Sequence, residues 1–378
     1  MLTLIDHPYG GAEQLALSVA TRLDPERFES TLCVSRWPHT TPREPRAEEL
    51  LEQLAASKVG FLGLGRRRKS DVWVWGRLGR FLRRERIDVL HAHKFGSNVW
   101  GTLLGRAAGV PVILAHEHTW SYEGQPLRRA LDRHVIARGS DRLIAVSRED
   151  QRRMIEVEGI PPGRTLFIPI GVPHTEPQRN RDVRAELGIE PGAPVIGAVG
   201  MLRPQKAFHV LLRAAALLVR ARPDIQVLIA GDGPEREALH ELARELGVDG
   251  SVRLLGRRTD VPDVLRALDI AVLCSDFEGS PAAVIEYMGA ALPVVATSVG
   301  GVPDLIEAGK HGLLVPPGEP VALADAIAEL LADPESARAM GARGRERRIA
   351  EFDIDILVHR LEDLYGELLA MRGIQLAC

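Results

Sequence analysis

Two glutamates, Glu278 and Glu286, stand with seven residues between them in the second half of the chain. Carboxylates accept hydrogen bonds from hydroxyl groups. A pair of them flanking a phosphate site could therefore hold a sugar on one side and a ribose on the other. The alternative interpretation is that Glu278 is a solvated loop acid and Glu286 a surface charge on a helix.

The residues between the two glutamates predict a phosphate site at the start of a helix. A buried strand is expected to end at Cys274, and Ser280 and Pro281 are then expected to open a helix as its N-cap and first residue. The first backbone N–H groups of a helix have no intrahelical partner and attract anions such as a diphosphate. We expect the substrate contacts of this segment to come from Gly279, Ser280, Ala282 and Ala283.

Two basic residues, Arg203 and Lys206, follow the strand expected at Val195–Val199. Cations at a strand exit can neutralise a pyrophosphate leaving group, and no metal is then required. We expect Lys206 to contact the phosphate, with Arg203 as a second positive charge beside it. Solvated loop cations are the alternative.

A pair of glycines, Gly10 and Gly11, lies between the first expected strand and a helix expected to start near Ala12. Glycine lets a backbone approach a ligand closely, and the start of a helix favours anions. A structural turn explains the same pair.

Four histidines form two His-x-His pairs, His91 with His93 and His116 with His118, each at the end of an expected strand. Alternate residues of a strand point to the same face, so either pair could bind a metal. This pattern supports a metal-dependent hydrolase as an alternative function. Against it, no third or fourth ligand is visible at a suitable spacing from either pair.

Composition excludes several classes of protein. Lys and Arg number 48 and Asp and Glu 51, a net charge of −3, which argues against a nucleic-acid binder. The three cysteines lie far apart and form neither a disulfide framework nor a zinc pattern, which favours a reducing cytosol. No apolar run approaches the roughly 18 residues of a membrane span, and no signal-peptide pattern is present. We therefore expect a cytoplasmic protein.

Short apolar strands alternate with amphipathic helices, which predicts an α/β protein with parallel sheets. A segment rich in proline and glycine, Pro169–Pro177, is expected to link two doubly wound domains, 1–172 and 173–354. Such sheets bind ligands at the carboxyl ends of their strands. The expected strands are Leu2–Ile5, Thr31–Val34, Val59–Leu62, Val89–His91, Val112–Ala115, Leu143–Val146, Leu166–Ile168, Val195–Val199, Gln226–Ala230, Val252–Leu255, Ile270–Cys274, Val294–Ala296 and Leu313–Val315.

Taken together, these motifs resemble the large retaining family of GT-B glycosyltransferases often called family 4. Glu278 and Glu286 match its E-x7-E motif, and the segments 292–304 and 312–318 also look like that family. The likeness runs from Gly10 to Phe352. It implies a GT-B fold, in which two Rossmann-like domains face each other across a cleft and the final helix, 355–370, packs back on the first domain.

The resemblance also implies roles for individual residues. A histidine after the strand 112–115 reaches the transferred sugar in this family; His118 is expected here, with His116 as the alternative. Arg257 lies in the loop whose backbone meets the base, and the Gly10–Gly11 loop lies between the donor phosphates and the acceptor. Three positions depart from the family pattern: Met201 stands in place of an arginine, and Ala207 and Ala291 in place of glycines.

The implied activity is transfer of a sugar from a nucleotide diphospho-sugar to a hydroxyl acceptor, with retention of configuration and no metal cofactor. A UDP-sugar is favoured over GDP-mannose as the donor, and a glycan, a lipid-linked molecule or a small molecule could be the acceptor. Cell-surface glycan or glycolipid synthesis is the expected context. A nucleotide-sugar epimerase, the metal-dependent hydrolase and a non-catalytic sugar-nucleotide binder remain as alternatives.

A basic stretch, Arg66–Arg84, is the last feature of note. Trp73 and several arginines are expected on one face of a helix over 71–86, while Val72, Trp75, Leu78 and Leu82 are expected to be buried. A tryptophan among cations suggests peripheral contact with an anionic membrane, such as the inner face of a plasma membrane. A solvated arginine face is the alternative.

Overall fold

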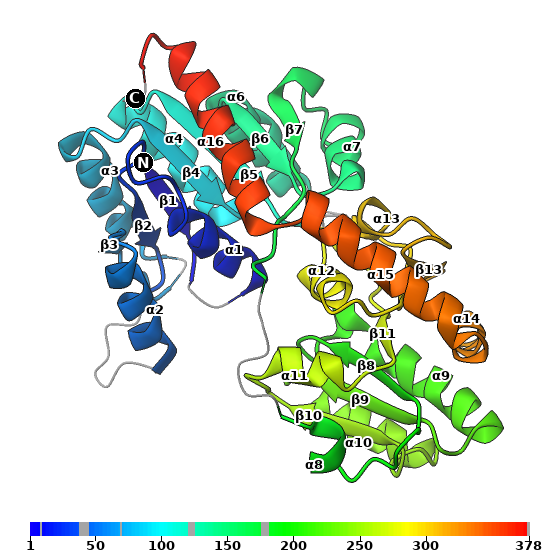
Figure 1. Ribbon diagram of the computed structural model, residues 1–378. Coiled ribbons are helices and arrows are strands. Elements are labelled where there is room, and N and C mark those ends of the chain that lie inside the picture. The colour runs from blue at the N-terminus through cyan, green and yellow to red at the C-terminus, as the bar shows by residue number, and fades with distance from the viewer. Residues whose placement is uncertain (8–9, 38–44, 69, 120–124, 175–180, 376–378) are drawn as a thin grey trace. The chain divides into compact units, whose positions relative to one another are not determined.

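The computed structural model describes residues 1–7, 10–37, 45–68, 70–119, 125–174 and 181–375. Contacts divide the chain into two compact units, one comprising Met1–Pro173 and Ile354–Cys378 and the other His174–Asp353. Each unit contains one parallel sheet with helices on both of its faces (Figure 1).

The first unit has a seven-stranded sheet in the order β3-β2-β1-β4-β5-β6-β7. Its strands are β1 (Leu2–Ile5), β2 (Thr31–Val34), β3 (Gly60–Gly63), β4 (Val89–His93), β5 (Val112–Glu117), β6 (Arg142–Ala145) and β7 (Thr165–Phe167). Its helices are α1 (Gly11–Ala20), α2 (Pro45–Ala56), α3 (Trp75–Arg84), α4 (Phe95–Ala108), α5 (Pro126–Leu131), α6 (Ala137–Gly139), α7 (Arg148–Glu156) and α16 (Ile354–Ala370), with short helical segments at Val72–Val74, Asp132–Ile136 and Pro162–Arg164.

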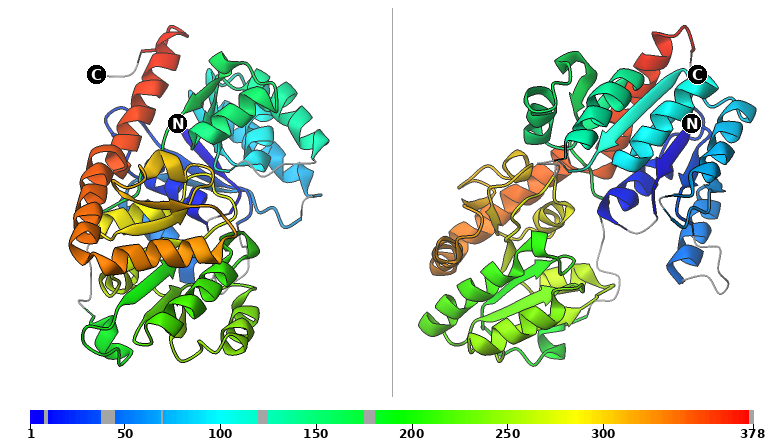
Figure 2. Two further views of the ribbon diagram at one scale, coloured as in Figure 1. Left: turned by 90° about the vertical axis from the view of Figure 1, so that its right-hand side faces the viewer. Right: turned by 180° about the vertical axis from the view of Figure 1, so that it is seen from behind.

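The two faces of this sheet are covered by different helices because successive side chains of a strand point in opposite directions. Leu2, Leu4 and Leu90 pack with α3 and α4, whereas Ile5 packs with α1 and α2. Helix α16, drawn in red, lies along the sheet on the side to which His91 points (Figure 2).

The second unit has a six-stranded sheet in the order β10-β9-β8-β11-β12-β13. Its strands are β8 (Val195–Val199), β9 (Gln226–Ala230), β10 (Val252–Gly256), β11 (Ile270–Leu273), β12 (Val294–Thr297) and β13 (Gly312–Val315). Its helices are α8 (Val183–Glu186), α9 (Phe208–Ala221), α10 (Arg236–Glu245), α11 (Val261–Arg266), α12 (Ala282–Gly289), α13 (Val302–Leu305), α14 (Pro320–Ala332) and α15 (Pro334–Glu351), with a 3-10 turn at Pro204–Lys206.

In each sheet the chain reverses its direction of winding at one point, between β1 and β4 in the first unit and between β8 and β11 in the second. The loops that follow these neighbouring strands diverge and leave room for a ligand. The candidate residues Gly10, Gly11 and His93 follow or end strands at the first switch point. Lys206 and Glu278 follow strands at the second.

Candidate functional site

The side chains of Lys206 and Glu278 meet at the switch point of the second unit. The Nζ of Lys206 donates to Oε1 of Glu278 at 2.5 Å, and the hydroxyl of Ser275 donates to the same oxygen at 2.6 Å. Glu278 is 8% exposed. A buried carboxylate requires such partners, because burying an unpaired charge is costly. The pair therefore holds a cation and a carboxylate at one place, in the loops after the neighbouring strands β8 and β11.

Backbone contacts fix the two loops that carry this pair. The side-chain amide of Gln205 donates to the carbonyl of Phe277 at 2.8 Å, and the N–H of Asp276 donates to the carbonyl of Gln205 at 2.9 Å. The thiol of Cys274 donates to the carbonyl of Lys206 at 3.2 Å. These three hydrogen bonds hold the loop after β8 and the loop after β11 against each other.

Two glycines allow neighbouring loops to approach this region. Gly300 has a φ of 50°, and a Cβ there would lie 1.7 Å from the carbonyl oxygen of Glu278. A Cβ on Gly231 would lie 1.8 Å from the carbonyl oxygen of Gly200. Any side chain at either position would push the loops apart. The carbonyl of Gly279 accepts a hydrogen bond from the N–H of Gly301 at 2.6 Å. This bond joins the loop after β11 to the loop after β12.

The helix after Glu278 begins one residue later than expected. Helix α12 runs from Ala282 to Gly289 with Pro281 as its N-cap, and no side chain caps it. The expectation that Ser280 is the N-cap is wrong. Pro281 has an extended backbone with a ψ of 109°, so it is itself the N-cap and Ser280 lies one residue before it. The N–H groups of Ala282 and Ala283 nevertheless lie in the first turn, where they have no intrahelical partner.

Glu286 lies inside α12 and is half-buried. Burial raises the pKa of its carboxyl to about 7. The neighbouring Tyr287 accepts a hydrogen bond from the N–H of Val199 at 2.7 Å, and so ties α12 to β8. Glu286 is therefore a carboxyl on a fixed helix whose charge changes near neutral pH.

The two candidate arginines of the second unit, Arg203 and Arg257, are exposed. Within the residues that the structure describes, neither forms an ion pair. The neighbouring Arg258 instead binds Glu186 and Asp260, both at 2.7 Å. Arg203 and Arg257 thus present unpaired positive charge on the loops after β8 and β10.

In the first unit, Gly10 caps helix α1, and a Cβ there would lie 2.3 Å from Oε2 of Glu13. No such contact restricts Gly11. Glu13 is 1% exposed and accepts from Nζ of Lys94 at 2.5 Å. Sequence reasoning missed this ion pair, although Glu13 and Lys94 follow strands β1 and β4, which are neighbours in the sheet.

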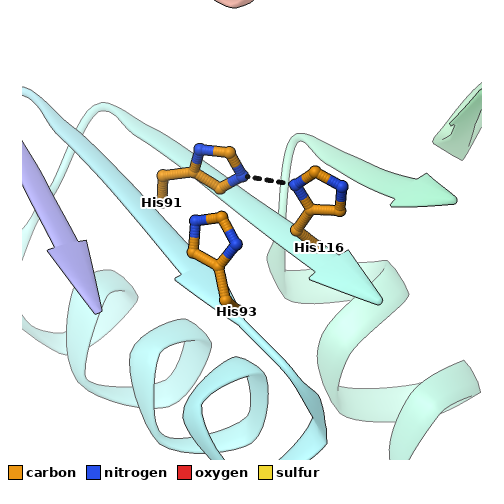
Figure 3. Close-up of side chains that lie close together, drawn as sticks. All are labelled: His91, His93 and His116. Carbon is orange, nitrogen blue, oxygen red and sulfur yellow. Dashed lines mark hydrogen bonds between the residues drawn. The ribbon is translucent and has the colours of Figure 1, made fainter. Parts of the chain in front are cut away.

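The two His-x-His pairs form one cluster, because β4 and β5 are paired in register with His93 opposite His116. Nε2 of His91 lies 3.3 Å from Nδ1 of His116, as Figure 3 shows. Nδ1 of His93 lies 3.0 Å from Nε2 of His118. The expectation that neither pair has a third ligand nearby is wrong: each pair supplies the other's.

Burial determines the charge of these rings. It lowers the pKa of His116 to about 3. Burial, and then the charges of neighbouring histidines, also lower the pKa of His91, His93 and His118 well below the usual range. All four are therefore neutral imidazoles at neutral pH. His116 is 1% exposed, whereas His118, at the end of the series, is half-buried.

The basic stretch of the first unit differs in part from its expected form. A 3-10 turn over Val72–Val74 precedes α3, and Val72 is 53% exposed, so the prediction that it is buried is wrong. Trp73 is 71% exposed and lines a surface cavity. The cavity is lined by Leu64, Gly65, Arg67, Arg68, Asp71, Trp73, Val74, Arg77 and Arg80. In the part of the chain that the structure covers, no helix is both long and apolar enough for a transmembrane segment. Contact of this basic face with a lipid surface stays a prediction.

Comparison with known proteins places both units in known sequence families. Residues 179–347 match the family described as glycosyl transferases group 1, and residues 9–176 match the family described as glycosyltransferase family 4.

Curated relatives and solved structures are similar over most of the chain. A D-inositol 3-phosphate glycosyltransferase of Thermobispora bispora is 33% identical over 75% of this chain and 71% of its own length. An alpha-D-kanosaminyltransferase of Streptomyces kanamyceticus is 28% identical over 79% of this chain and 82% of its own. The crystal structure of HepE of Anabaena in complex with UDP-glucose superposes with a TM-score of 0.83 at 22% identity, over 97% of this chain and 99% of that one.

Proposed function

Because the chain belongs to the group 1, family 4 glycosyltransferases, a retaining family with the GT-B fold, we propose that its donor is a UDP-hexose. The UDP-glucose bound to the structurally similar HepE supports this choice. The observation that carries the proposal is the Lys206–Glu278 pair beside the start of α12. It offers a cation, helix N–H groups and a carboxylate at one switch point.

In this proposal Lys206 and the N–H groups of Ala282 and Ala283 stabilise the charge that develops on the leaving diphosphate. Arg203 adds positive charge on the same loop. When the donor binds, its phosphate replaces Glu278 as the partner of Lys206, and Glu278 accepts hydrogen bonds from the sugar hydroxyls. Gly279 and Ser280 line the segment between them.

Glu286 holds the ribose, and Arg257 lies at the loop that meets the base. A carboxylate accepts hydrogen bonds from ribose hydroxyls best when it is ionised. Replacing Glu286 with alanine should therefore weaken binding of a UDP-hexose in a calorimetric titration. An unchanged affinity would rule out the ribose role.

His118 is the histidine that contacts the sugar near the reacting carbon, because His116 is almost fully buried and His118 is not. The bond between the anomeric carbon and the diphosphate oxygen breaks, and its electron pair leaves with the phosphate. The acceptor hydroxyl forms the new bond on the same face, and its proton passes to the departing phosphate oxygen. No enzyme nucleophile and no metal ion takes part.

The acceptor we propose is a phosphorylated cyclic polyol of the inositol phosphate type, received beside the Gly10–Gly11 loop. Curated relatives of this chain are D-inositol 3-phosphate glycosyltransferases. The side chain of Lys94 is 40% exposed, and its amino group lies near that loop through its bond to Glu13, where it could pair with a phosphate.

The proposed donor and acceptor can be tested in two steps. Thermal shift against UDP, GDP, ADP and their sugars should show the largest stabilisation with the UDP series, since a ligand that binds only the folded state raises the melting temperature. Nuclear magnetic resonance of the product formed from UDP-glucose and inositol phosphate should then show the α-anomer. Stabilisation by GDP alone would overturn the donor, and a product with inverted configuration would overturn the mechanism.

A further inference from the structure

The histidine cluster of the first unit has more members than the proposed transfer reaction uses. Only His118 is given a role in transfer, while His91, His93 and His116 lie behind it at exposures of 0%, 2% and 1%. One ring nitrogen of each of these three lies within 4.8 Å of the others (Figure 3). Three neutral imidazoles gathered inside a sheet edge require an explanation beyond packing.

The hydrogen bonds within the cluster do not complete it. Nε2 of His93 and Nε2 of His116 are buried and have no hydrogen-bond partner among the described residues. Buried polar atoms in folded proteins are nearly always paired, and an exception indicates a missing water or ion. The two unpartnered nitrogens are therefore available to coordinate an ion, which a fully hydrogen-bonded cluster of histidines could not do.

The distances within the cluster suit tetrahedral coordination by nitrogen. Zinc binds imidazole at 2.0–2.1 Å, so two nitrogens of a tetrahedral site lie about 3.3 Å apart. Nε2 of His91 lies 3.3 Å from Nδ1 of His116, and one ring nitrogen of each of His91, His93 and His116 lies within 4.8 Å of the others. These three rings can therefore supply three ligands of a tetrahedral site.

An outer hydrogen bond orients the first of these ligands. Nδ1 of His91 lies 2.7 Å from the hydroxyl of Tyr365, which α16 buries against the sheet. Histidines that bind metals almost always donate their other ring N–H to such a partner, which leaves the facing nitrogen free to coordinate. Tyr365 thus leaves Nε2 of His91 directed at His116.

We propose that His91, His93 and His116 bind one zinc-class divalent transition-metal ion. Imidazole ligands suit Zn²⁺, Co²⁺, Ni²⁺ and Cu²⁺, whereas Mg²⁺ and Ca²⁺ require oxygen. The ion is an inhibitor and not a cofactor, because it binds His93, whose Nδ1 lies 3.0 Å from Nε2 of His118 and so helps to hold the ring that the sugar requires. This inhibitory part rests on the proposed function, and the binding part does not.

Equilibrium dialysis of the full-length protein against ZnCl2, followed by metal analysis, tests the binding part. The wild type should retain one Zn²⁺ per chain, and Co²⁺ in its place should give the visible absorption of a tetrahedral site. His116→Gln should lose that ion, and Tyr365→Phe should bind it 10- to 100-fold more weakly. His134→Gln is the matched control, because His134 is an exposed histidine of the same unit.

Circular dichroism establishes that each variant is folded before its zinc is counted. If the wild type retains no zinc, or if folded His116→Gln retains as much as the wild type, the metal site is wrong. If Tyr365→Phe binds zinc as tightly as the wild type, the outer-shell assignment is wrong.

A transfer assay with and without ZnCl2 tests the inhibitory part. Zinc should inhibit the wild type, a chelator should restore its activity, and Tyr365→Phe should need 10- to 100-fold more zinc for the same inhibition. Bound zinc with undiminished transfer would overturn inhibition and leave the metal site standing. If the chelated enzyme shows no transfer but binds zinc again when zinc is added back, that result would count against the proposed function alone.

Discussion

The Nζ of Lys206 lies 2.5 Å from Oε1 of Glu278, although 71 residues separate the two in the chain. The pair exists because β8 and β11 are neighbours in the sheet while their following loops are braced to each other. Each group neutralises the charge of the other. In the proposed function, a diphospho-sugar replaces both partners, with an anion for the lysine and hydroxyl groups for the glutamate.

The first prediction concerns this pair. Lys206→Ala should lower kcat/KM by about 10²- to 10³-fold, because it removes one preorganised charge from the leaving diphosphate. The double variant with Glu278→Gln should lose less than the product of the two single losses, since residues in contact are not additive. Steady-state kinetics of the four proteins give the coupling.

Lys310→Ala is the control for that cycle. Lys310 is an exposed lysine of the same unit and pairs only with Glu307 at 3.1 Å among the described residues. It should leave kcat/KM unchanged. Near wild-type turnover of Lys206→Ala would contradict the assigned role.

The second prediction concerns Glu286 and pH. Burial raises its pKa from the ordinary 4.5 to about 7. The folded chain therefore keeps a proton that the unfolded chain loses at about pH 4.5, and the contribution of this group to stability falls as pH rises from about 4.5 to 7. Glu286→Gln removes that dependence.

Denaturant unfolding of the wild type and Glu286→Gln at several pH values measures the effect. The free energy of unfolding of the variant should exceed that of the wild type increasingly between pH 5 and 7 and by a constant amount above it. A difference that does not change with pH would mean that the carboxyl titrates normally.

The third prediction concerns Ala291, which has a φ of 56°. A left-handed conformation costs a residue with a Cβ roughly 1–2 kcal/mol, and glycine loses about 0.5–1 kcal/mol through the unfolded state. Ala291→Gly should therefore raise the free energy of unfolding by about 0.5–1 kcal/mol. Thermal unfolding should show an increase of a few degrees.

Two comparisons sharpen that experiment. Ala207 has a φ of 47° but is 1% exposed, so Ala207→Gly also loses buried apolar contacts and should raise the free energy of unfolding by less. Ala214→Gly, inside α9, should destabilise the protein by about 1 kcal/mol. If Ala291→Gly also destabilises it, the backbone there is not strained.

The fourth prediction concerns metal removal. Dialysis against a chelator should not lower kcat, because Lys206 and the first turn of α12 supply the charge that a metal would otherwise supply. If chelation abolishes transfer and added Mg²⁺ restores it, the reaction depends on a metal ion and this prediction is wrong. The measurement is an initial rate before and after dialysis.

The fold was predictable from the sequence because every strand is a short apolar run between turns. The strands Leu2–Ile5, Thr31–Val34, Val195–Val199 and Gln226–Ala230 have the bounds expected for them. Strands that are buried on both faces are short continuous apolar runs. Their alternation with amphipathic helices along the chain therefore predicted the doubly wound α/β class.

The relations between strands were not predictable in the same way. The sequence showed no third ligand for either histidine pair, since spacing in the chain does not give the register that sets His93 opposite His116. The Glu13–Lys94 pair was missed for the same reason. The prediction of Ser280 as the cap was wrong because Pro281 has an extended backbone and is itself the N-cap, which the sequence pattern does not show.

A calorimetric titration with UDP-glucose tests the central claim most directly, namely that Lys206 and Glu278 contact the bound donor. The wild type should bind one equivalent, Lys206→Ala should bind at least ten times more weakly, and Lys310→Ala should match the wild type. Equal affinity of the wild type and Lys206→Ala would contradict the claim.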